Sequence, residues 1–361
     1  APASFPLSVS MPLSQNVHSH ETIEAYLWGL LPDNQAVLDQ WGKQFQVSPR
    51  NAFRLIEHVG EDCAGAIQFI SQDREDSLLG QTYSEQVQWL NEDELTERIR
   101  LVLENHGNQR ISTDQGQFSL AGAQAKIALY QSPTTGRWGI PYAMTPTTHI
   151  LKPAPNNFPG FVENEHFCLS LASALDIASA SSSVIHLADV PVIVVTRYDR
   201  QFFGSNCIRI HQEDFCQARA VYPDLKYQND GGPSVADIAN TIWEVSNDAY
   251  TDIRTFADAL ILNFLISGTD AHAKNFSLLL AGNNQVRLAP LYDMASTLPY
   301  PRVISPHKAK LAMKIGNSYH VKKIQRSHWQ VCAKELRIPE TEIIQRIHEM
   351  ANRVQQVAPK L

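Results

Sequence analysis

Apolar residues recur every three or four positions through the first part of the chain, which is the period of an amphipathic helix. The predicted helices cover residues 22–31, 34–45, 49–58 and 91–104. Pro32 and Asp33 separate the first two, because this pair breaks a helix. Pro49 suits a first helical position, where its missing N–H costs nothing. We therefore expect a helical segment at the beginning of the chain.

The pattern changes to short strands from about residue 111. The predicted strands cover residues 117–120, 125–131, 138–141, 148–152, 190–196 and 208–211. Residues 190–196 form a near-continuous β-branched run, which indicates a strand buried on both faces, with residues 208–211 as its expected partner. A helix is predicted over residues 163–175, between these strands.

Helical periodicity dominates after residue 215. The predicted helices cover residues 235–245, 253–267, 320–336 and 340–357. An α/β half followed by a helical half is the order of a bilobal protein-kinase-like fold. We therefore predict an α/β (α+β) protein with a mixed, sheet-containing N-terminal lobe and an all-helical C-terminal lobe. The expected parts are a helical N-terminal subdomain (1–110), a nucleotide-binding sheet lobe (111–217) and a helical catalytic lobe (218–361).

Composition narrows the class of protein. The 361 residues are 43% hydrophobic and 19% charged, which is typical of a globular chain with two or three subdomains. The formal net charge of −7 argues against nucleic acid as the main direct ligand. The densest basic stretches, residues 308–310 and 322–326, are interpreted as a solvated helix face. Five dispersed cysteines without a C-x-x-C pair indicate reduced thiols, so a cytoplasmic location is expected. The most apolar stretch, residues 257–266, is too short to span a membrane, so no membrane contact is expected.

The candidate chemistry lies in residues 268–276 and 290–295. Asp270 is followed five positions later by Asn275, and Asp293 comes eighteen positions after that. Phosphoryl transfer from ATP uses this order: Asp270 can take the proton of an attacking hydroxyl, while Asn275 and Asp293 hold Mg²⁺ against the phosphates. A lone D-x-x-x-x-N is common by chance. The apolar sequence around Asp293 and a candidate lysine upstream favour the kinase interpretation.

That lysine is Lys152, at the end of a predicted strand. It can reach the α- and β-phosphates of ATP, and Glu165 on the next helix can pair with it. Taken alone, a lysine at a strand end is more often a surface residue. Its position between a loop of small residues and the helix that carries Glu165 favours ATP binding.

The loop of small residues reads Ser119-Leu-Ala-Gly-Ala-Gln-Ala-Lys126. Its backbone N–H groups can approach phosphates closely because no bulky side chain stands in the way, and Lys126 adds positive charge. It is not a Walker A sequence, and on spacing alone it is an ordinary hairpin. The residues assigned to nucleotide binding here are Ala121, Gly122, Ala123, Gln124 and Lys126.

Residues 196–200, Thr-Arg-Tyr-Asp-Arg, close the buried strand at the place of a kinase hinge. A hinge there would hold adenine by backbone hydrogen bonds, and Asp199 can bind ribose hydroxyls. A charged strand end that faces water explains the same residues equally well. Both interpretations stay open at this point.

Eight segments in order carry a resemblance to a known family. They are residues 118–126, 147–153 (Thr-Thr-His-Ile-Leu-Lys-Pro), 163–169, 197–200, 211–217, 226–233 (Lys-Tyr-Gln-Asn-Asp-Gly-Gly-Pro), 268–276 and 290–293. In combination they resemble the HipA family of bacterial serine/threonine kinase toxins, over roughly residues 20 to 350. The combination is far more specific than any single motif.

The resemblance implies a kinase that transfers the γ-phosphate of ATP to a protein serine with Mg²⁺. Asp270 would be the catalytic base, Asn275 and Asp293 the metal ligands, and Lys152 a phosphate contact. The implied nucleotide pocket is lined by Arg197, Tyr198, Asp199, Gln212, His272 and Tyr292. Ser119 matches the serine whose autophosphorylation switches the family's kinases off.

The resemblance also implies partners. Relatives phosphorylate aminoacyl-tRNA synthetases, notably the glutamyl enzyme, which stalls translation and promotes persistence. They pair with HipB, a helix-turn-helix antitoxin that makes the DNA contacts and represses transcription. Three departures stand out: Thr196 replaces a glutamate at the hinge, residues 152–163 form a shorter connection, and the N-terminal subdomain is only partly present.

Two other functions fit parts of the sequence. A small-molecule kinase of the aminoglycoside type shares the D-x-x-x-x-N order but gives Ser119 no special role. A catalytically silent module that binds the antitoxin as a co-repressor has no need of Asp270, Asn275, Asp293 and Lys152 together. ATP turnover by the purified protein distinguishes the silent module from either kinase.

Overall fold

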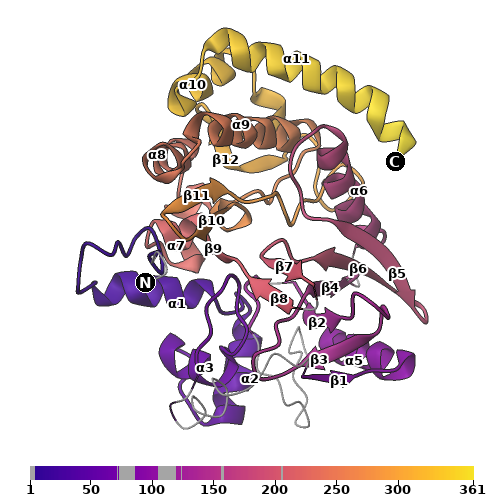
Figure 1. The fold of residues 1–361 in the computed structure, drawn as a ribbon. Helices are drawn as coiled ribbons and strands as arrows, with labels where there is room; N and C mark the ends of the chain where they lie inside the picture. Colours follow the sequence, from indigo (N-terminus) through magenta and orange to yellow (C-terminus); the bar gives the residue numbers. More distant parts are fainter. Residues whose placement is uncertain are drawn as a thin grey trace. The chain divides into compact units, whose positions relative to one another are not determined.

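The computed structural model describes residues 5–70, 72, 86–104, 119–122, 124–155, 158–204 and 206–361. The chain forms two compact units (Figure 1). Unit 1 comprises Ala1–Tyr26, Glu163–Ala180 and Glu213–Leu361, and unit 2 comprises Leu27–Val162 and Ser181–Gln212. The chain thus passes from one unit to the other at four points, which differs from the three consecutive parts predicted.

A six-stranded antiparallel sheet, in the order β1-β3-β2-β4-β6-β5, forms the centre of unit 2. Its strands are β1 (Val87–Trp89), β2 (Ile127–Gln131), β3 (Trp138–Pro141), β4 (His149–Pro153), β5 (Ser182–Leu187) and β6 (Val190–Thr196). The amphipathic helix α5 (Glu92–Glu104) packs Ile99 and Val102 into the same core as Leu129 of β2 and Val192 of β6. Burial of this apolar face attaches the helix to the sheet.

Two helices and a hairpin complete the described part of unit 2. Helices α2 (Gln35–Phe45) and α3 (Ala52–Val59) each begin after an asparagine whose side chain accepts a backbone N–H. Strand β8 (Asn206–Arg209) pairs with β7 (Arg200–Phe203), and β6 pairs with β4 and β5. The prediction that residues 208–211 pair with 190–196 is therefore wrong. Of the predicted strand 117–120, residues 117–118 lie outside the described residues and the rest is not strand.

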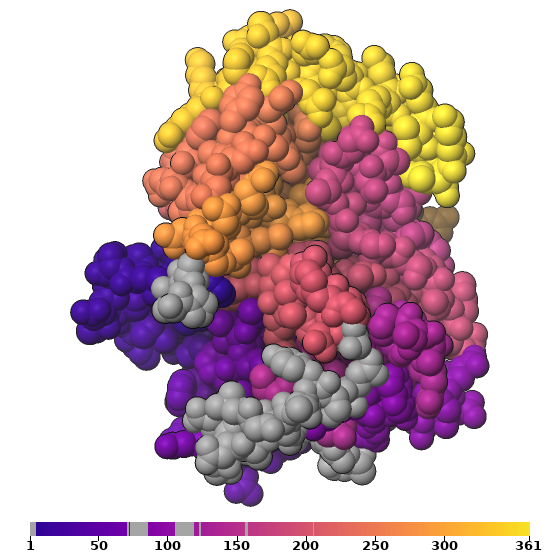
Figure 2. Space-filling model, viewed as in Figure 1, coloured from indigo at the N-terminus to yellow at the C-terminus, as the bar shows by residue number. Residues whose placement is uncertain are grey.

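Unit 1 is mainly helical. Its helices are α6 (Phe161–Ala174), α7 (Phe215–Ala218), α8 (Val235–Val245), α9 (Ala249–Leu265), α10 (Arg326–Leu336) and α11 (Glu340–Val357), and the first helix, α1 (His20–Gly29), begins in this unit. Short 3₁₀ turns are η1 (Pro223–Leu225), η2 (Gln228–Asp230), η3 (Ala273–Asn275), η4 (Val321–Lys323) and η5 (Ala358–Lys360). Helix α9 is buried along most of its length, and α11 packs on α9 and α10. Figure 2 shows α10 and α11 as an outer surface of this unit.

Unit 1 also contains strands, so its predicted all-helical character is wrong although the α/β class is confirmed. Strands β11 (Gln285–Leu288), β10 (Ser277–Ala281) and β9 (His211–Asp214, which enters from unit 2) form one sheet, and β12 (Lys310–Ile315) with β13 (Ser318–His320) forms another. Strand β13 ends at His320 and η4 follows it, so α10 begins six residues later than the helix predicted from residue 320. No helix in the described part of the chain is long and apolar enough to cross a membrane.

Candidate active site

The loop that carries Asp270 follows the C-terminus of α9 in unit 1. The Gly268 N–H donates to the carbonyl of Asn263 at 2.7 Å, and a Cβ on Gly268 would come within 2.2 Å of the Asn263 side chain. Only glycine therefore fits where the loop leaves the helix. The Asp270 side chain is exposed, and the backbone carbonyl of Asp270 accepts bonds from the His272 N–H and the Asn275 amide, each at 2.8 Å.

The structure thus brings Asp270 and Asn275 together, as the motif predicts. Asn275 is 7% exposed, and its Nδ2 group points to the Asp270 carbonyl. No described residue donates to its amide oxygen, which is the atom that a hard cation would use. The same contact that shapes the loop therefore fixes the direction of this amide oxygen.

A buried ion pair holds the Asp270 loop in place. Lys274 Nζ lies 3.3 Å from Asp214 Oδ2, and the two side chains are 4% and 9% exposed. Asp214 also caps α7 by accepting the Gln217 N–H. The sequence analysis missed this pair. Nothing in the local sequence connects Lys274 with an aspartate sixty residues earlier.

Asp293 lies beyond β11, in a second loop of unit 1. Its φ is +55°, a left-handed conformation that costs a non-glycine residue of order 1 kcal/mol and that is concentrated at functional sites. The preceding Tyr292 donates its hydroxyl proton to the Lys274 carbonyl at 2.6 Å and bonds Ser277 Oγ at 2.6 Å. Tyr292 therefore ties the Asp293 loop to the Asp270 loop, a role the sequence did not indicate.

His272 belongs to the Asp270 loop and is only 5% exposed. Burial lowers the pKa of His272. The carboxylates of Asp270 and Asp293 raise it and the nearby lysines lower it, each by less than burial does. Both aspartates are thus close enough to affect one imidazole. Its Nδ1 atom is buried without a hydrogen-bond partner among the described residues. A neutral ring with one unused polar atom suits contact with a polar ligand.

The small-residue loop of unit 2 is closely packed. Ser119 is fully buried, with its hydroxyl donating to the Leu30 carbonyl at 2.7 Å. Lys126 Nζ donates to the Ala121 carbonyl at 2.7 Å, and a Cβ on Gly122 (φ +102°) would come within 2.5 Å of that nitrogen. Gln124 Nε2 is buried without a partner among the described residues, and Ala123 lies outside them.

Lys152 is buried at 6% exposure in β4, opposite Ile193 of β6. It belongs to unit 2, whereas Glu165 of α6, at 1% exposure, belongs to unit 1. Each side chain is thus placed within its own unit. Their pairing stays a prediction.

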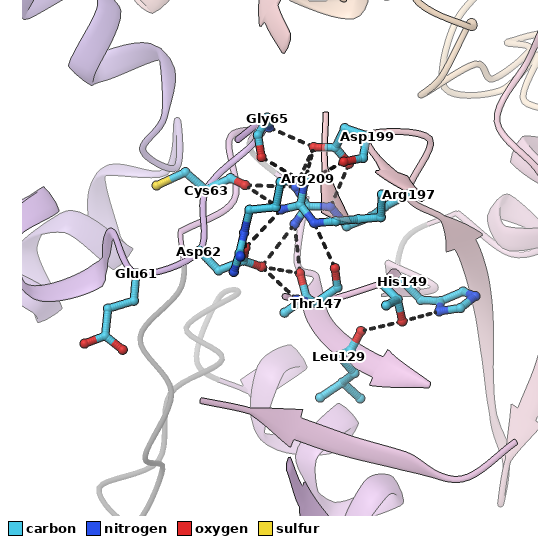
Figure 3. A network of polar contacts seen from close by, with 12 residues as sticks. Glu61, Asp62, Cys63, Gly65, Leu129, Thr147, His149, Arg197, Asp199 and Arg209 are labelled. Carbon is cyan, nitrogen blue, oxygen red and sulfur yellow. Dashed lines mark hydrogen bonds and ion pairs between the residues drawn. The ribbon is translucent and has the colours of Figure 1, made fainter. Parts of the chain in front are cut away.

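Arg197 and Asp199 belong to a buried charge cluster in unit 2 (Figure 3). Asp199 accepts bonds from Arg197 Nε and Nη2 (2.9 and 2.7 Å) and from the Gly65 N–H (2.7 Å), and Arg200 Nη1 lies 3.0 Å away. Its carboxylate oxygens are therefore engaged by the protein. This differs from the ribose contact expected of Asp199, and it gives Arg197 a structural partner.

Asp62 completes the cluster. Burial alone would raise the pKa of Asp62, but Arg200, Arg209 and Arg197 together with the Thr147 hydroxyl hold it below its ordinary value. Arg200 Nη2 and Arg209 Nε contact Asp62 Oδ1 at 3.0 and 2.9 Å, and Thr147 donates to Oδ2. The cluster joins the segment after α3 to the end of β6 and to β8. The sequence analysis missed Asp62, which follows a helix in no recognisable motif.

Tyr198, between Arg197 and Asp199, is half-buried and points to a different partner. Its hydroxyl donates to Gln212 Oε1, so two predicted pocket residues meet within unit 2. The β7–β8 hairpin lies between them in the sequence. Its two strands pair with each other, and this brings Tyr198 and Gln212 together. Their proposed contact with a nucleoside stays a prediction.

Comparisons with known proteins agree with this arrangement. A family model described as the HipA-like C-terminal domain matches residues 118–358, and the HipA N-terminal domain matches residues 1–70. The chain is 36% identical to the putative kinase Y4mE of Sinorhizobium fredii over 333 residues, which covers 92% of this chain and 77% of that protein. It is 27% identical to the serine/threonine-protein kinase toxin HipA of Shewanella oneidensis, covering 98% and 80%.

A solved structure shows the same fold. The complex of HipA, HipB and operator DNA from Shewanella oneidensis contains a chain that matches 99% of this one with a TM-score of 0.83, at 24% identity and over 82% of its own length. The family models, which together span most of the sequence, decide the relationship. The chain belongs to the HipA family.

Proposed function

We propose that this protein is a Mg²⁺- and ATP-dependent serine/threonine protein kinase and the toxin of a type II toxin–antitoxin system. The observation that carries the proposal is the loop cluster of unit 1. There the backbone carbonyl of the exposed Asp270 accepts a bond from Asn275, and the Asp270 and Asp293 carboxylates both act on the pKa of His272. Relatives named as kinases support the same chemistry.

In the proposed reaction, Asp270 accepts the proton of the attacking serine hydroxyl. The Asn275 amide oxygen and the Asp293 carboxylate would hold Mg²⁺, since oxygen donors with one or two carboxylates are what this ion uses beside nucleotide phosphates. Bound Mg²⁺ supplies neutralisation of the charge on the phosphates. No group of three or more His, Cys, Asp or Glu suited to a metal occurs among the described residues, so the donor set is small.

We propose that unit 2 contributes the remaining nucleotide contacts. The backbone of residues 121–124, with Lys126 and Lys152, would bind the phosphates. Tyr198 and Gln212 would contact the nucleoside, as would His272 and Tyr292. Arg197 and Asp199 would act by holding the strand end in shape, because their charged groups are engaged with each other.

The proposed substrate is an aminoacyl-tRNA synthetase, with the glutamyl enzyme first, so that phosphorylation inhibits translation and promotes persistence. A HipB-like antitoxin is the proposed partner, with DNA contacted through it. The solved complex of the Shewanella protein with HipB and operator DNA supports this assignment. Autophosphorylation of Ser119 is the proposed off-switch. It requires the serine to leave the buried position beside the Leu30 carbonyl.

Intact-protein mass spectrometry after incubation with Mg·ATP tests the function. We expect one added phosphate on Ser119 of the wild type. Asp270→Gln should transfer phosphate at least about a hundredfold more slowly, because the amide of glutamine cannot accept the proton of the attacking hydroxyl. Ser119→Ala should retain ATP turnover without acquiring the phosphate. Wild-type rates in Asp270→Gln would refute the role of the base, and an unmodified, folded wild type without ATP turnover would refute the kinase.

A further inference from the structure

A tyrosine to which the sequence analysis assigned no role, in the segment 226–233, contacts the proposed base. Tyr227 donates its hydroxyl proton to Asp270 Oδ1 at 2.5 Å, and both residues belong to unit 1. The Tyr227 side chain is half-buried, whereas Asp270 is exposed. The other oxygen, Asp270 Oδ2, accepts no bond from the described residues. The two oxygens of the base are therefore not equivalent.

The backbone at Tyr227 is held by a tight turn. The Tyr227 carbonyl accepts the N–H groups of Asp230 and Gly232, both at 3.0 Å. Gly231 has a φ of +98°, and a Cβ on Gly232 would come within 1.9 Å of the Leu225 carbonyl oxygen. Two consecutive glycines are thus required for the turn that presents the phenol.

The Tyr227 ring is also held in place by the Asp270 loop. It packs edge-on against His272, with ring centroids 4.9 Å apart and an interplanar angle of 85°. The Lys226 carbonyl accepts the Ala273 N–H at 3.3 Å, so the two segments are joined by backbone as well. The phenol therefore reaches Asp270 from a support built into the same loop cluster.

This contact has a direct consequence for proton transfer. An aspartate carboxylate turns broadly about its terminal torsion, and an exposed one has few contacts to stop it. A phenol at neutral pH is a hydrogen-bond donor, so Tyr227 can fix one oxygen without taking the proton itself. The second oxygen is then held in one direction, available to an acceptor hydroxyl. Such positioning of a reacting group is worth a large factor in rate.

We propose that Tyr227 is a positioning residue that orients Asp270 for proton abstraction. The proposal rests on the proposed kinase function, and it adds a residue that the D-x-x-x-x-N motif does not contain. It predicts that loss of the phenol hydroxyl slows the chemical step and leaves ATP binding unchanged. A merely structural tyrosine would alter stability and ATP affinity together.

Self-phosphorylation with γ-labelled ATP and Mg²⁺ tests this prediction in the full-length protein. In Tyr227→Phe, which keeps the ring against His272, we expect the maximal rate to fall roughly tenfold to a hundredfold. The ATP concentration that gives half of that rate should not change. The matched control is Tyr250→Phe on α9, which removes a similar tyrosine–carboxylate bond to Glu342 of α11 (3.0 Å) and should keep the wild-type rate. An unchanged or faster rate in Tyr227→Phe overturns the proposal, and a faster rate would show that the phenol blocks the base.

A spectroscopic measurement separates this proposal from the kinase function. Protein labelled with 3-fluorotyrosine contains eleven reporters, and the ¹⁹F resonance missing from Tyr227→Phe identifies the one of interest. We expect that resonance to shift in Asp270→Ala, because the phenol loses its acceptor, while the Tyr250 resonance stays in place. An unmoved Tyr227 resonance refutes the contact whatever the activity. A wild type that transfers no phosphate refutes the kinase function even if the resonance moves.

Discussion

At the scale of single residues, Glu213 is a buried carboxylate whose charge depends on pH. It is 1% exposed, its Oε1 accepts the Val9 N–H at 2.8 Å, and its Oε2 accepts the Ser8 hydroxyl. Burial raises the pKa of Glu213 to about 8, against the smaller opposite effect of these two bonds. The folded protein therefore keeps this carboxyl protonated at a pH where the unfolded chain releases the proton.

This environment predicts that Glu213→Gln removes a pH-dependent loss of stability. Because the folded-state pKa is raised, the wild type is fully stabilised below the ordinary value of 4.5 and loses stability as pH rises to about 8. The loss approaches about 1.4 kcal/mol per pH unit at most. In urea unfolding at several pH values between these limits, the free energy of unfolding of Glu213→Gln should increase relative to that of the wild type as pH rises. The exposed Glu97→Gln is the control, and parallel curves for wild type and Glu213→Gln would contradict the assignment.

At the scale of elements, the loop of Asp270 takes its shape from the elements around it. Lys274 reaches Asp214 at the start of α7, and Tyr292 reaches the Lys274 carbonyl from the second loop. Removing one member of a buried ion pair leaves the other charge without compensation. The position of Asp270 therefore depends on structural contacts made by neighbouring residues of its loop.

We expect Lys274→Met to lower the free energy of unfolding by roughly 3–5 kcal/mol, because the Asp214 carboxylate stays buried without its partner. Adding Asp214→Asn should restore part of the loss, since asparagine can still cap α7. Arg254→Met, which breaks an exposed pair with Glu342, should cost less than about 1 kcal/mol. Denaturant unfolding measures all three, and equal losses in Lys274→Met and Arg254→Met would argue against a buried, structural pair.

Local pattern accounts for what could be predicted of these elements. Asp270 and Asn275 meet because they lie five residues apart in one loop, and the helices follow from their period. Strand partners could not be deduced, because a strand-like pattern shows that a segment is extended but not which segment it pairs with, and β8 pairs with β7. Asp199 was predicted to be a ligand because one of its donors, the Gly65 N–H, lies far away in the sequence and becomes its neighbour only through the fold. Tyr227 carries no sequence signal of its role.

At the scale of the whole molecule, each unit has its own buried charges. Unit 2 depends on Asp62 and Asp199, whose pKa values are held below the ordinary range by arginines although burial opposes this. A carboxylate with a depressed folded-state pKa stabilises the fold above its unfolded pKa, near 3.9, and that contribution is lost as pH falls further. We therefore expect unit 2 to be acid-sensitive below about pH 4.

Asp199→Asn should show this dependence directly. The variant removes the negative charge that pairs with Arg197 and Arg200. We therefore expect backbone hydrogens in peptides from β4 and β6 to exchange faster at neutral pH, by a factor that corresponds to roughly 3–5 kcal/mol. Its further loss on acidification should be smaller than that of the wild type. Asp176→Asn, at an exposed pair with Arg353, is the control. Hydrogen exchange read by mass spectrometry would contradict the prediction if both variants matched the wild type.

The order in which the ribosome makes the chain gives the interleaved units a further meaning. The first 26 residues belong to unit 1, most of which lies after residue 213. Ser8 and Val9 bind Glu213, so this segment can complete its contacts only after a partner about two hundred residues further along the chain has been made. Because domains generally fold as they emerge, unit 1 is the last to close. A nascent chain that lacks the residues of unit 1 therefore carries no finished loop around Asp270, and whatever chemistry this loop performs begins only after that unit has been made.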